Sequence, residues 1–240
     1  MNFKASKLKA RHGFRDGLPI GLGYLSVSFG FGISAVSKGL SPLVATLISM
    51  TNLTSAGQVA GISVIAASGA IIEMMMTQLI INLRYSLMGL TLTQKLDESF
   101  STLHRAAVSF FITDEIFAVA SSKDSVNTRY MYSLGVLPYT GWALGTLLGA
   151  VAGSLLPSHI SASLGIAIYG MFIAIIVPPA KKEKGILFAV LLSVALSCIL
   201  KYVPVFSFIT QGFAVIICAI VAALAAALLF PVKEVAEGDS

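Results

Sequence analysis

Long apolar runs, separated by short polar or basic stretches, make up most of the sequence. A helix that spans a bilayer needs about 20 mostly apolar residues. Runs that approach or exceed this length occur at Leu18–Ser37, Pro42–Ala67, Ala70–Leu92, Ala106–Ser121, Tyr130–Leu156, Ile160–Pro178, Gly185–Tyr202 and Val205–Phe230. The pattern predicts an all-α, polytopic membrane helix bundle with about seven or eight transmembrane helices.

Polar residues interrupt the second run. The stretch MTNLTSAGQ, residues 50–58, places Asn52, Ser55 and Gln58 near mid-span, so we expect the second helix to be broken there. Backbone groups freed by a break are tolerated at membrane depth only where they line a cavity or are buried in protein. In transporters such unwound segments bind the charged ends of substrates. A helix that only bends for packing is the alternative.

The basic residues indicate which loops face the cytoplasm. Two dense groups flank apolar runs: one is Lys4, Lys7, Lys9, Arg11 and Arg15, and the other is Lys181, Lys182 and Lys184. Basic loops are retained in the cytoplasm. Both basic groups face the cytoplasm if the broken second segment crosses the membrane. If only that segment entered the membrane and returned without crossing, Lys181, Lys182 and Lys184 would lie outside. We therefore expect a crossing second segment, about eight crossings in all, and seven if another, such as the short fourth, is irregular.

This orientation divides the chain into three parts. We expect a basic cytoplasmic segment at residues 1–17, a single transmembrane domain at 18–231 and a cytoplasmic tail at 232–240. Both chain ends then lie on the cytoplasmic side.

Composition supports a membrane protein and excludes several other classes. Charged residues make up 11% of the chain, against about 25% in soluble domains. The net charge of +5 comes from groups that flank apolar runs, so we expect a lipid bilayer and no nucleic acid as partner. His12, His104 and His159 have no partner at metal-ligand spacing, and no GK[ST] phosphate loop occurs. We expect no enzyme activity, no metal and no cofactor.

Arg84 is the costliest polar residue in the predicted spans. In IINLRYSLMG, residues 80–89, it lies near the middle of an apolar run, where an arginine costs about 2.5 to 3.5 kcal/mol. The next run carries Asp114 and Glu115 at its centre. Antiparallel neighbours bring the three side chains to a similar depth, so we expect Arg84 to pair with one acid.

There are two acids and one arginine, so one acid is left without a cationic partner, and this suggests a role in proton transfer. The unpaired acid retains a proton more readily because desolvation disfavours its charged form. Such an acid is suited to couple proton movement to transport. The alternative is a purely structural clamp, with the second acid in a water-filled vestibule.

Two further features have plainer interpretations. Glu73 lies about one turn from the start of its predicted helix, so we expect it at the cytoplasmic interface without a specific role. Small residues recur at every fourth position in the fifth run, at Gly141, Gly145, Gly149 and Gly153. Such a stripe is typical of close helix packing.

Several motifs spread over most of the chain are familiar in combination. They are LPIGLGYLSVSFGFG at 18–32, SAGQ at 55–58, NLRYSLM at 82–88, TDEIFA at 113–118 and WALGTLLGAVAG at 142–153. In these the chain resembles the AzlC family, the large subunits of bacterial branched-chain amino-acid exporters. One departure is Gly165, where family members often carry an Asp, so no role of that acid is carried over.

The resemblance implies a function, a partner and a location. The function is secondary export of hydrophobic amino acids such as Leu, Ile, Val or Met, driven by the proton gradient. The partner is a small AzlD-like membrane subunit. The location is the bacterial cytoplasmic membrane, with several passes and a cytoplasmic N-terminus.

Together, the residues and the resemblance define a candidate site. The ion-pair and proton-coupling candidates are Arg84, Asp114 and Glu115. Polar candidates to bind an amino-acid zwitterion are Asn52, Ser55, Gln58, Asn82, Tyr85 and Thr113. Candidates to contact its aliphatic side chain are Met74, Met75, Met76, Phe110 and Phe111. Two other classes stay open: a passive small-molecule channel and a non-transporting membrane assembly subunit.

Overall fold

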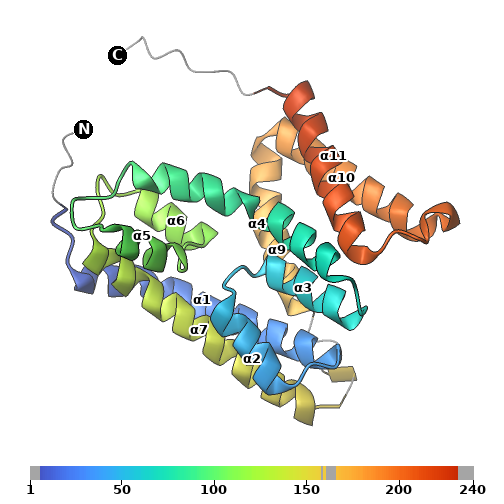
Figure 1. The fold of residues 1–240 in the computed structure, drawn as a ribbon, viewed down its shortest axis with the longest axis horizontal. Helices are drawn as coiled ribbons and strands as arrows, with labels where there is room; N and C mark the ends of the chain where they lie inside the picture. The colour runs from blue at the N-terminus through green and yellow to red at the C-terminus, as the bar shows by residue number, and fades with distance from the viewer. Residues whose placement is uncertain (1–5, 158, 161–165, 232–240) are drawn as a thin grey trace. The chain divides into compact units, whose positions relative to one another are not determined.

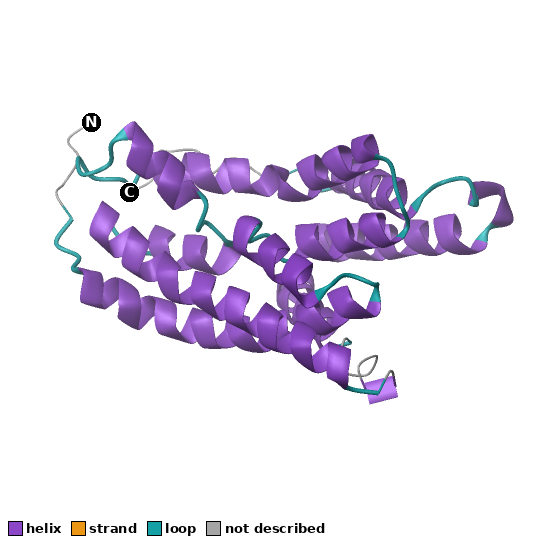
Figure 2. Ribbon diagram, turned by 60° about the horizontal axis from the view of Figure 1, so that its bottom comes forward, coloured by secondary structure: helices purple, strands orange, loops and turns teal. Residues whose placement is uncertain are grey.

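A computed structural model describes residues 6–157, 159–160 and 166–231 and shows an all-helical protein (Figure 1). Its elements are α1 (Ala10–Ser37), α2 (Pro42–Thr51), α3 (Ala56–Ala66), α4 (Ile71–Thr93), α5 (Thr102–Ser109), α6 (Asp114–Ser121), α7 (Thr128–Leu155), α9 (Ala167–Lys182), α10 (Lys184–Tyr202), the 3-10 helix η1 (Pro204–Phe206) and α11 (Gln211–Leu229). Within the described residues there is no strand, only an isolated bridge (Figure 2). The predicted all-α fold is confirmed there, whereas Gly165 and the tail at 232–240 lie outside the described residues.

The chain forms two compact units. The first comprises Met1–Ile62 and Asn82–Tyr169, and the second comprises Ser63–Ile81 and Gly170–Ser240. Four helices in the described part are long and apolar enough to cross a membrane: α1, α7, α10 and α11. The total of seven or eight crossings and the single domain at 18–231 stay predictions.

Helices α1 and α7 form the centre of the first unit and run parallel. A Cβ atom added at Gly13, Gly21 or Gly32 of α1 would collide with Tyr130, Leu137 or Thr146 of α7, in that order. The α7 glycines of the predicted stripe face α1 in the same way, since a Cβ at Gly149 would overlap the carbonyl of Phe29. The stripe is therefore a close-packing surface, as predicted.

This packing also explains where α1 begins. The helix starts at Ala10 rather than at the predicted Leu18. Gly13 and Gly17 already lie against the α7 backbone, so the first turns of α1 are stabilised by tertiary contact although their residues are polar.

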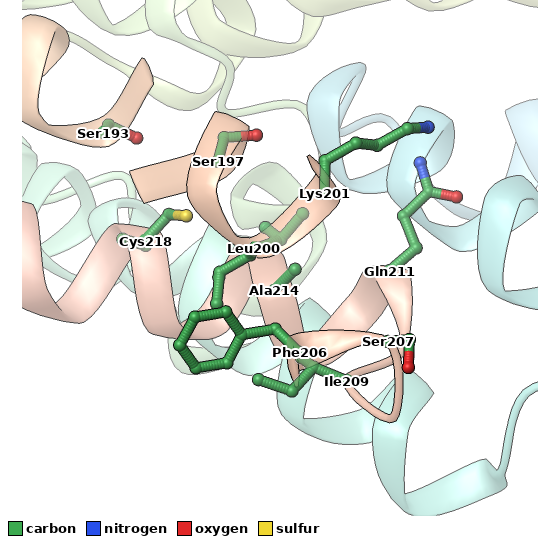
Figure 3. A pocket seen from close by; sticks show the side chains of 12 residues that line it. Ser193, Ser197, Leu200, Lys201, Phe206, Ser207, Ile209, Gln211, Ala214 and Cys218 are labelled. Carbon is green, nitrogen blue, oxygen red and sulfur yellow. The ribbon is translucent and has the colours of Figure 1, made fainter. Parts of the chain in front are cut away.

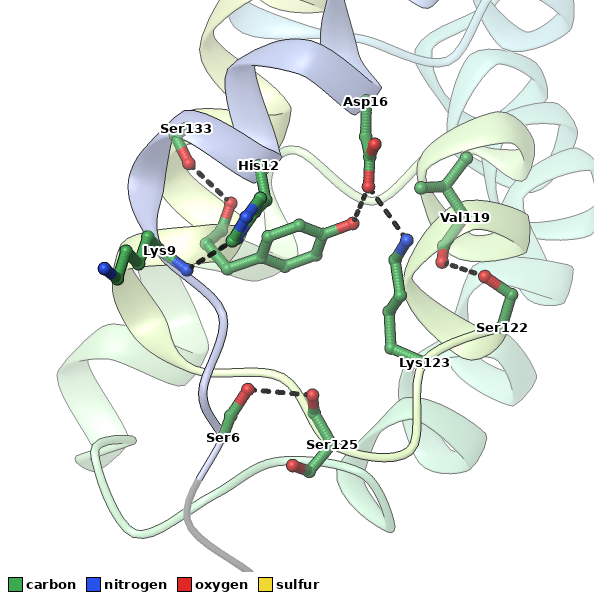
Figure 4. Close-up of polar contacts among 10 residues, drawn as sticks. Ser6, Lys9, His12, Asp16, Val119, Ser122, Lys123, Ser125 and Ser133 are labelled. Atoms are coloured by element: carbon green, nitrogen blue, oxygen red, sulfur yellow. Dashed lines mark hydrogen bonds and ion pairs between the residues drawn. The ribbon is translucent and has the colours of Figure 1, made fainter.

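Three segments meet at one end of the first unit. The Asp97 amide donates to the Val126 carbonyl at 3.0 Å, the Val126 amide donates to the Lys95 carbonyl at 2.9 Å, and the Asn127 side chain donates to the Leu8 carbonyl at 2.8 Å. Beside them, Asp16 of α1 forms an ion pair with Lys123 at 2.9 Å (Figure 4). We call the end formed by residues 6–9, 94–100 and 122–129 the basic end.

Helices α5 and α6 both connect to the basic end, which corrects the predicted fourth crossing. Residues 94–100 precede α5 and residues 122–127 follow α6, and these two stretches are hydrogen-bonded to each other. Each helix has eight residues, about 12 Å in length, far short of the roughly 30 Å of a bilayer core. The segment expected to cross at 106–121 instead enters from the basic end, breaks at residues 110–113 and returns.

The second segment is broken as predicted, between α2 and α3. That this segment crosses the membrane stays a prediction. Helix α4, uninterrupted over 23 residues and about 35 Å long, follows it.

The second unit is built around α10 and α11. The Phe188 and Phe230 rings pack together with centroids 5.6 Å apart, so the start of α10 lies beside the end of α11 and the two helices are antiparallel. Figure 3 shows the cavity between them, which has a volume of about 650 Å³. Its polar lining includes Ser193, Ser197 and Lys201 of α10 with Gln211 and Cys218 of α11.

Candidate functional site

Arg84 pairs with Asp114, as the sequence predicts. Arg84 Nη1 lies 2.7 Å from Asp114 Oδ2. Both side chains are partly open, with 41% and 37% of their surfaces exposed. The guanidinium also lies over the Tyr85 ring, 5.1 Å from its centroid, and donates to the Tyr85 hydroxyl at 3.3 Å. The long arginine side chain therefore folds back over its neighbour in the sequence.

The two acids lie at a helix terminus and not at a helix centre. Thr113 is the N-cap of α6 and accepts a hydrogen bond from the Ile116 amide, so Asp114 and Glu115 occupy the first turn. Unpaired amide groups and the helix dipole favour negative charge there. The position stabilises carboxylates that a continuous helix would leave exposed to hydrocarbon.

Glu115 has a different partner from Asp114. Within the described residues the ion pairs are Arg84–Asp114 and Lys123–Asp16, so no cation pairs with Glu115 there. Its carboxylate accepts a hydrogen bond from the Tyr24 hydroxyl. The same hydroxyl lies 2.6 Å from Thr113 Oγ1. Because the Tyr24 hydroxyl has one hydrogen, it can donate to only one of these two oxygens at a time.

Tyr24 connects the acids to the middle of the α1–α7 pair. It lies within one residue of the midpoint of α1, and Trp142 lies equally close to the midpoint of α7. Their rings form an edge-to-face contact with centroids 5.2 Å apart. Leu53, from the break between α2 and α3, belongs to the same buried cluster as the two rings. Tyr24 therefore contacts the breaks of both irregular segments at mid-depth of the two longest helices of this unit.

The break between α2 and α3 is irregular backbone supported by its own side chains. Asn52 ends α2, and its side-chain oxygen accepts a hydrogen bond from the Thr54 hydroxyl at 2.8 Å. Ser55 has a positive φ of 39°, a left-handed conformation uncommon for a residue other than glycine. Strain of this kind persists only where the surrounding structure imposes it, and here the turn lets α3 begin beside α2.

Gln58 is fully buried within a polar network. Its amide donates to Ser49 Oγ at 3.1 Å, and Ser49 Oγ lies 2.7 Å from Thr146 Oγ1 of α7. Within the described residues Gln58 Oε1 and Trp142 Nε1 are buried without a hydrogen-bond partner. Buried polar atoms of this kind call for an explanation such as a bound water or ligand. Gln58 is linked through Ser49 to Thr146, which lies one helical turn after Trp142 in α7.

An aromatic cluster lies at the break between α5 and α6. The Phe110 and Phe111 rings contact each other and Tyr139, with centroids 5.7 to 5.9 Å apart. Phe111 also lies against Gly135 of α7. These rings place apolar surface next to Thr113, whereas the other apolar candidates, Met74 to Met76, belong to the second unit.

The candidate residues therefore form two groups in the first unit. The α4 residues Arg84 and Tyr85, with Asn82 half-buried nearby, meet Asp114. The other group, which contains Asn52, Ser55, Gln58, Thr113 and Glu115, is assembled around Tyr24 and Trp142. Neither Tyr24 nor Trp142 was among the site residues predicted from the sequence. A signal was present, because a tyrosine at the centre of a membrane span needs a partner for its hydroxyl.

The site contains groups that can hold a proton and a cation that can bind an anionic group. Glu115, Tyr24 and Thr113 are three oxygen-bearing groups in contact, through which a proton can be passed or held. Arg84 offers a cation for a carboxylate. Across the described ranges, no group of three or more His, Cys, Asp or Glu residues is arranged to hold a metal ion.

Comparison with known proteins agrees with the motifs. The chain is 28% identical over 220 residues to the inner membrane protein YgaZ of Escherichia coli, covering 88% of each chain. It is 32% identical over 174 residues to a membrane protein of Archaeoglobus fulgidus, covering 70% of this chain and 76% of the relative. A membrane protein of Helicobacter pylori strain J99 is 29% identical over 150 residues, covering 59% of this chain and 64% of the relative. No solved structure matches.

The family comparison covers the part of the chain that carries the candidate site. The model described as "AzlC protein" matches residues 19–156, which contain the two broken segments, most of α1 and all of α7. This match spans more than half of the 240 residues. The chain is therefore a member of the AzlC family.

Proposed function

We propose that this protein is the large subunit of a secondary transporter that exports hydrophobic amino acids from the cytoplasm. Family membership and membrane-protein relatives support a role in membrane transport. The substrate class (Leu, Ile, Val and Met), the coupling to protons and the small AzlD-like subunit follow from the family resemblance. The site geometry then suggests which side chains carry each part.

The arrangement of Arg84, Asp114 and Glu115 is the observation that carries the proposal. One acid is neutralised by the arginine, and the other has a tyrosine hydroxyl as its partner in the described residues. Asp114 and Glu115 belong to the α5–α6 segment, which enters, breaks and returns, and Arg84 contacts it. In transporters, broken helices of this kind expose helix termini to a substrate within the membrane. Glu115 is then the proton carrier, and Asp114 holds Arg84 in position.

Substrate recognition is divided between the two breaks. The carboxylate of the amino acid binds Arg84 and Tyr85 when it displaces Asp114 from the guanidinium. Freed backbone groups and the side chains of Asn52, Ser55 and Thr113 bind the ammonium group. Phe110 and Phe111 contact the aliphatic side chain, which favours Leu, Ile, Val or Met over polar amino acids.

The basic end faces the cytoplasm in this proposal. It gathers Lys7, Lys9, Lys95, Lys123 and Arg129. Loops rich in Lys and Arg are retained on that side, so the α5–α6 segment enters the membrane from the cytoplasm and its tip reaches the middle of the α1–α7 pair. The acids are then accessible to protons and substrate through the partly open face of Arg84 and Asp114.

Efflux from loaded cells tests the proposal. Cells that express the chain together with its small subunit are loaded with Leu- or Met-containing dipeptides, and release of the free amino acid is followed with and without a protonophore. We expect export by the wild type that the protonophore abolishes. Arg84→Ala and Asp114→Asn should insert normally and lose export, because each leaves the other charge unpaired.

Three results would contradict the proposal. Export that continues at the wild-type rate in both variants would show that the ion pair is not part of the transport site. Release that follows the amino-acid gradient in both directions, unaffected by the protonophore, would identify a passive channel. Unchanged amino-acid fluxes after deletion of the chain would identify a non-transporting assembly subunit.

A further inference from the structure

Glu73 is a buried acid outside the candidate site. It lies in the first turn of α4, within the second unit, and only 3% of its surface is exposed. This burial does not test the interface position expected from the sequence, but it shows that the side chain has specific partners in the protein. None of the ion pairs among the described residues involves Glu73, so its charge is not compensated by a cation there.

The N-terminus of α11 holds the Glu73 carboxylate. Glu73 Oε1 accepts hydrogen bonds from the Thr210 hydroxyl and, at 2.8 Å, from the Gly212 amide. Thr210 is the N-cap residue of α11, and its own side chain forms no cap bond. The acid therefore replaces the missing cap at this helix terminus.

The space around this carboxylate fits an acid closely. A Cβ at Gly69 would lie 2.8 Å from Glu73 Oε2, and a Cβ at Gly212 would overlap Oε1. One turn after Glu73, on the same face of α4, Thr77 is fully buried and its hydroxyl has no hydrogen-bond partner among the described residues. A protonated Glu73 would find in that hydroxyl an acceptor for its O–H.

One hydrogen-bond partner of this acid lies at the surface of the unit. Thr210 is exposed, so the buried carboxylate is one hydrogen bond away from the outside of the unit. Few other titratable groups face it. The turn at 66–70 and the loop at 203–210 have none, and α11 contributes Cys218. Lys201, at the end of α10, lines the cavity that also contains Gln211, the first residue of α11.

We propose that Glu73 is a second proton-binding site of the transport cycle, which releases the N-terminus of α11 when it is protonated. This inference rests on the proposed function. The charged form holds the Gly212 amide, and protonation turns the carboxyl O–H toward Thr77 and weakens that hold. Because Gln211 and Ala214 line the cavity between α10 and α11, release of this terminus changes the shape of the cavity.

Glu73→Gln separates this role from a structural cap. The glutamine oxygen still accepts from Thr210 and Gly212, but the side chain cannot exchange a proton. The protein is reconstituted with its small subunit in vesicles, and Leu flux and proton flux are recorded with a labelled substrate and a pH-sensitive dye. Glu98→Gln, which removes an exposed acid at the basic end of the first unit, is the matched control.

We expect Glu73→Gln to retain Leu–Leu exchange within about twofold of the wild type, since exchange needs no net proton movement. Uphill export driven by a pH gradient should be lost, whereas Glu98→Gln should retain both. Uphill export by Glu73→Gln at the wild-type rate, with unchanged protons per Leu, would overturn the inference and leave Glu73 a structural cap. Failure of the wild type to move Leu in either assay would instead overturn the proposed function.

Discussion

The helix pairs α1–α7 and α10–α11 are both long and apolar, yet they are packed in opposite ways. In α1–α7, glycines on each helix lie against the backbone of the other, and Tyr24 and Trp142 fill the middle. In α10–α11, the helices contact each other, but a cavity of about 650 Å³ is lined by residues of both, and α10, which is described throughout, has no buried residue. Apolarity alone therefore does not decide how membrane helices pack.

The difference follows from the forces that act between helices in lipid. Lipid tails are as apolar as leucine, so helices associate through close van der Waals contact and polar contacts. The small-residue stripes of α1 and α7 permit such contact along the whole length, and the candidate site is fixed to that rigid pair through Tyr24. Small residues recur at every fourth position of α10 as well, at Gly185, Ala189, Ser193 and Ser197, but Ser193 and Ser197 line the cavity there. The N-terminus of α11 is held by Glu73.

The largest expected effect comes from breaking the close pair. Gly149→Leu places a side chain where the Phe29 carbonyl lies. The atoms nearest to the added Cβ are all backbone atoms of Phe29, so no side chain can move aside to make room. Overpacking of this kind typically costs about 1 to 3 kcal/mol or more. We expect the variant to aggregate after detergent extraction, as judged by size-exclusion chromatography. Gly23→Leu is the control on the same pair, because no atom lies within 4 Å of its added Cβ; equal damage by both would contradict the packing described.

A smaller effect is expected from loosening the link between this pair and the acids. Tyr24→Phe removes the hydroxyl that contacts Glu115 and Thr113 but keeps the ring on Trp142. Hydrogen bonds to charged groups contribute about 1.5 to 3 kcal/mol, which corresponds to a loss of efflux of roughly tenfold to a hundredfold. The protein should elute as the wild type does. Tyr139→Phe, which loses a hydroxyl contact to the Met50 carbonyl outside this chain of oxygens, should export normally.

The smallest effect is expected in the open pair. Ser197→Leu projects into the cavity between α10 and α11, where there is room for the larger side chain. Substitutions that meet no packed neighbour usually change stability by less than about 0.5 kcal/mol. The thermal midpoint in detergent should therefore match that of the wild type. A large fall in the midpoint would show that this pair is as tightly packed as α1–α7.

Hydropathy predicted one broken segment and missed the other for a physical reason. The break at 52–55 carries polar residues, whereas the break at 110–113 includes Phe110 and Phe111, which read as continuous apolar span. The available signal was Thr113 followed by two acids, the pattern of a helix N-cap and an acidic first turn. The Arg84–Asp114 pair was predictable because a charge at membrane depth requires a partner.

The contacts of Tyr24 and Glu73 could not be predicted from local sequence patterns. Each depends on residues more than eighty positions away in the chain, and none of these contacts joins opposite charges. Their hydroxyl and amide contacts become visible only when the helices are placed side by side.

Cysteine labelling of the two loops at the basic end tests the central claim most directly, namely that the α5–α6 segment enters and returns with both acids at its tip. In a background with Cys198 and Cys218 replaced by Ser, Glu98→Cys and Asp124→Cys are exposed to a membrane-impermeant thiol reagent in intact cells and in inverted vesicles. The account predicts that both positions react from the same side, that of the N-terminus. Reaction from opposite sides would show that the segment crosses the membrane and would contradict the account.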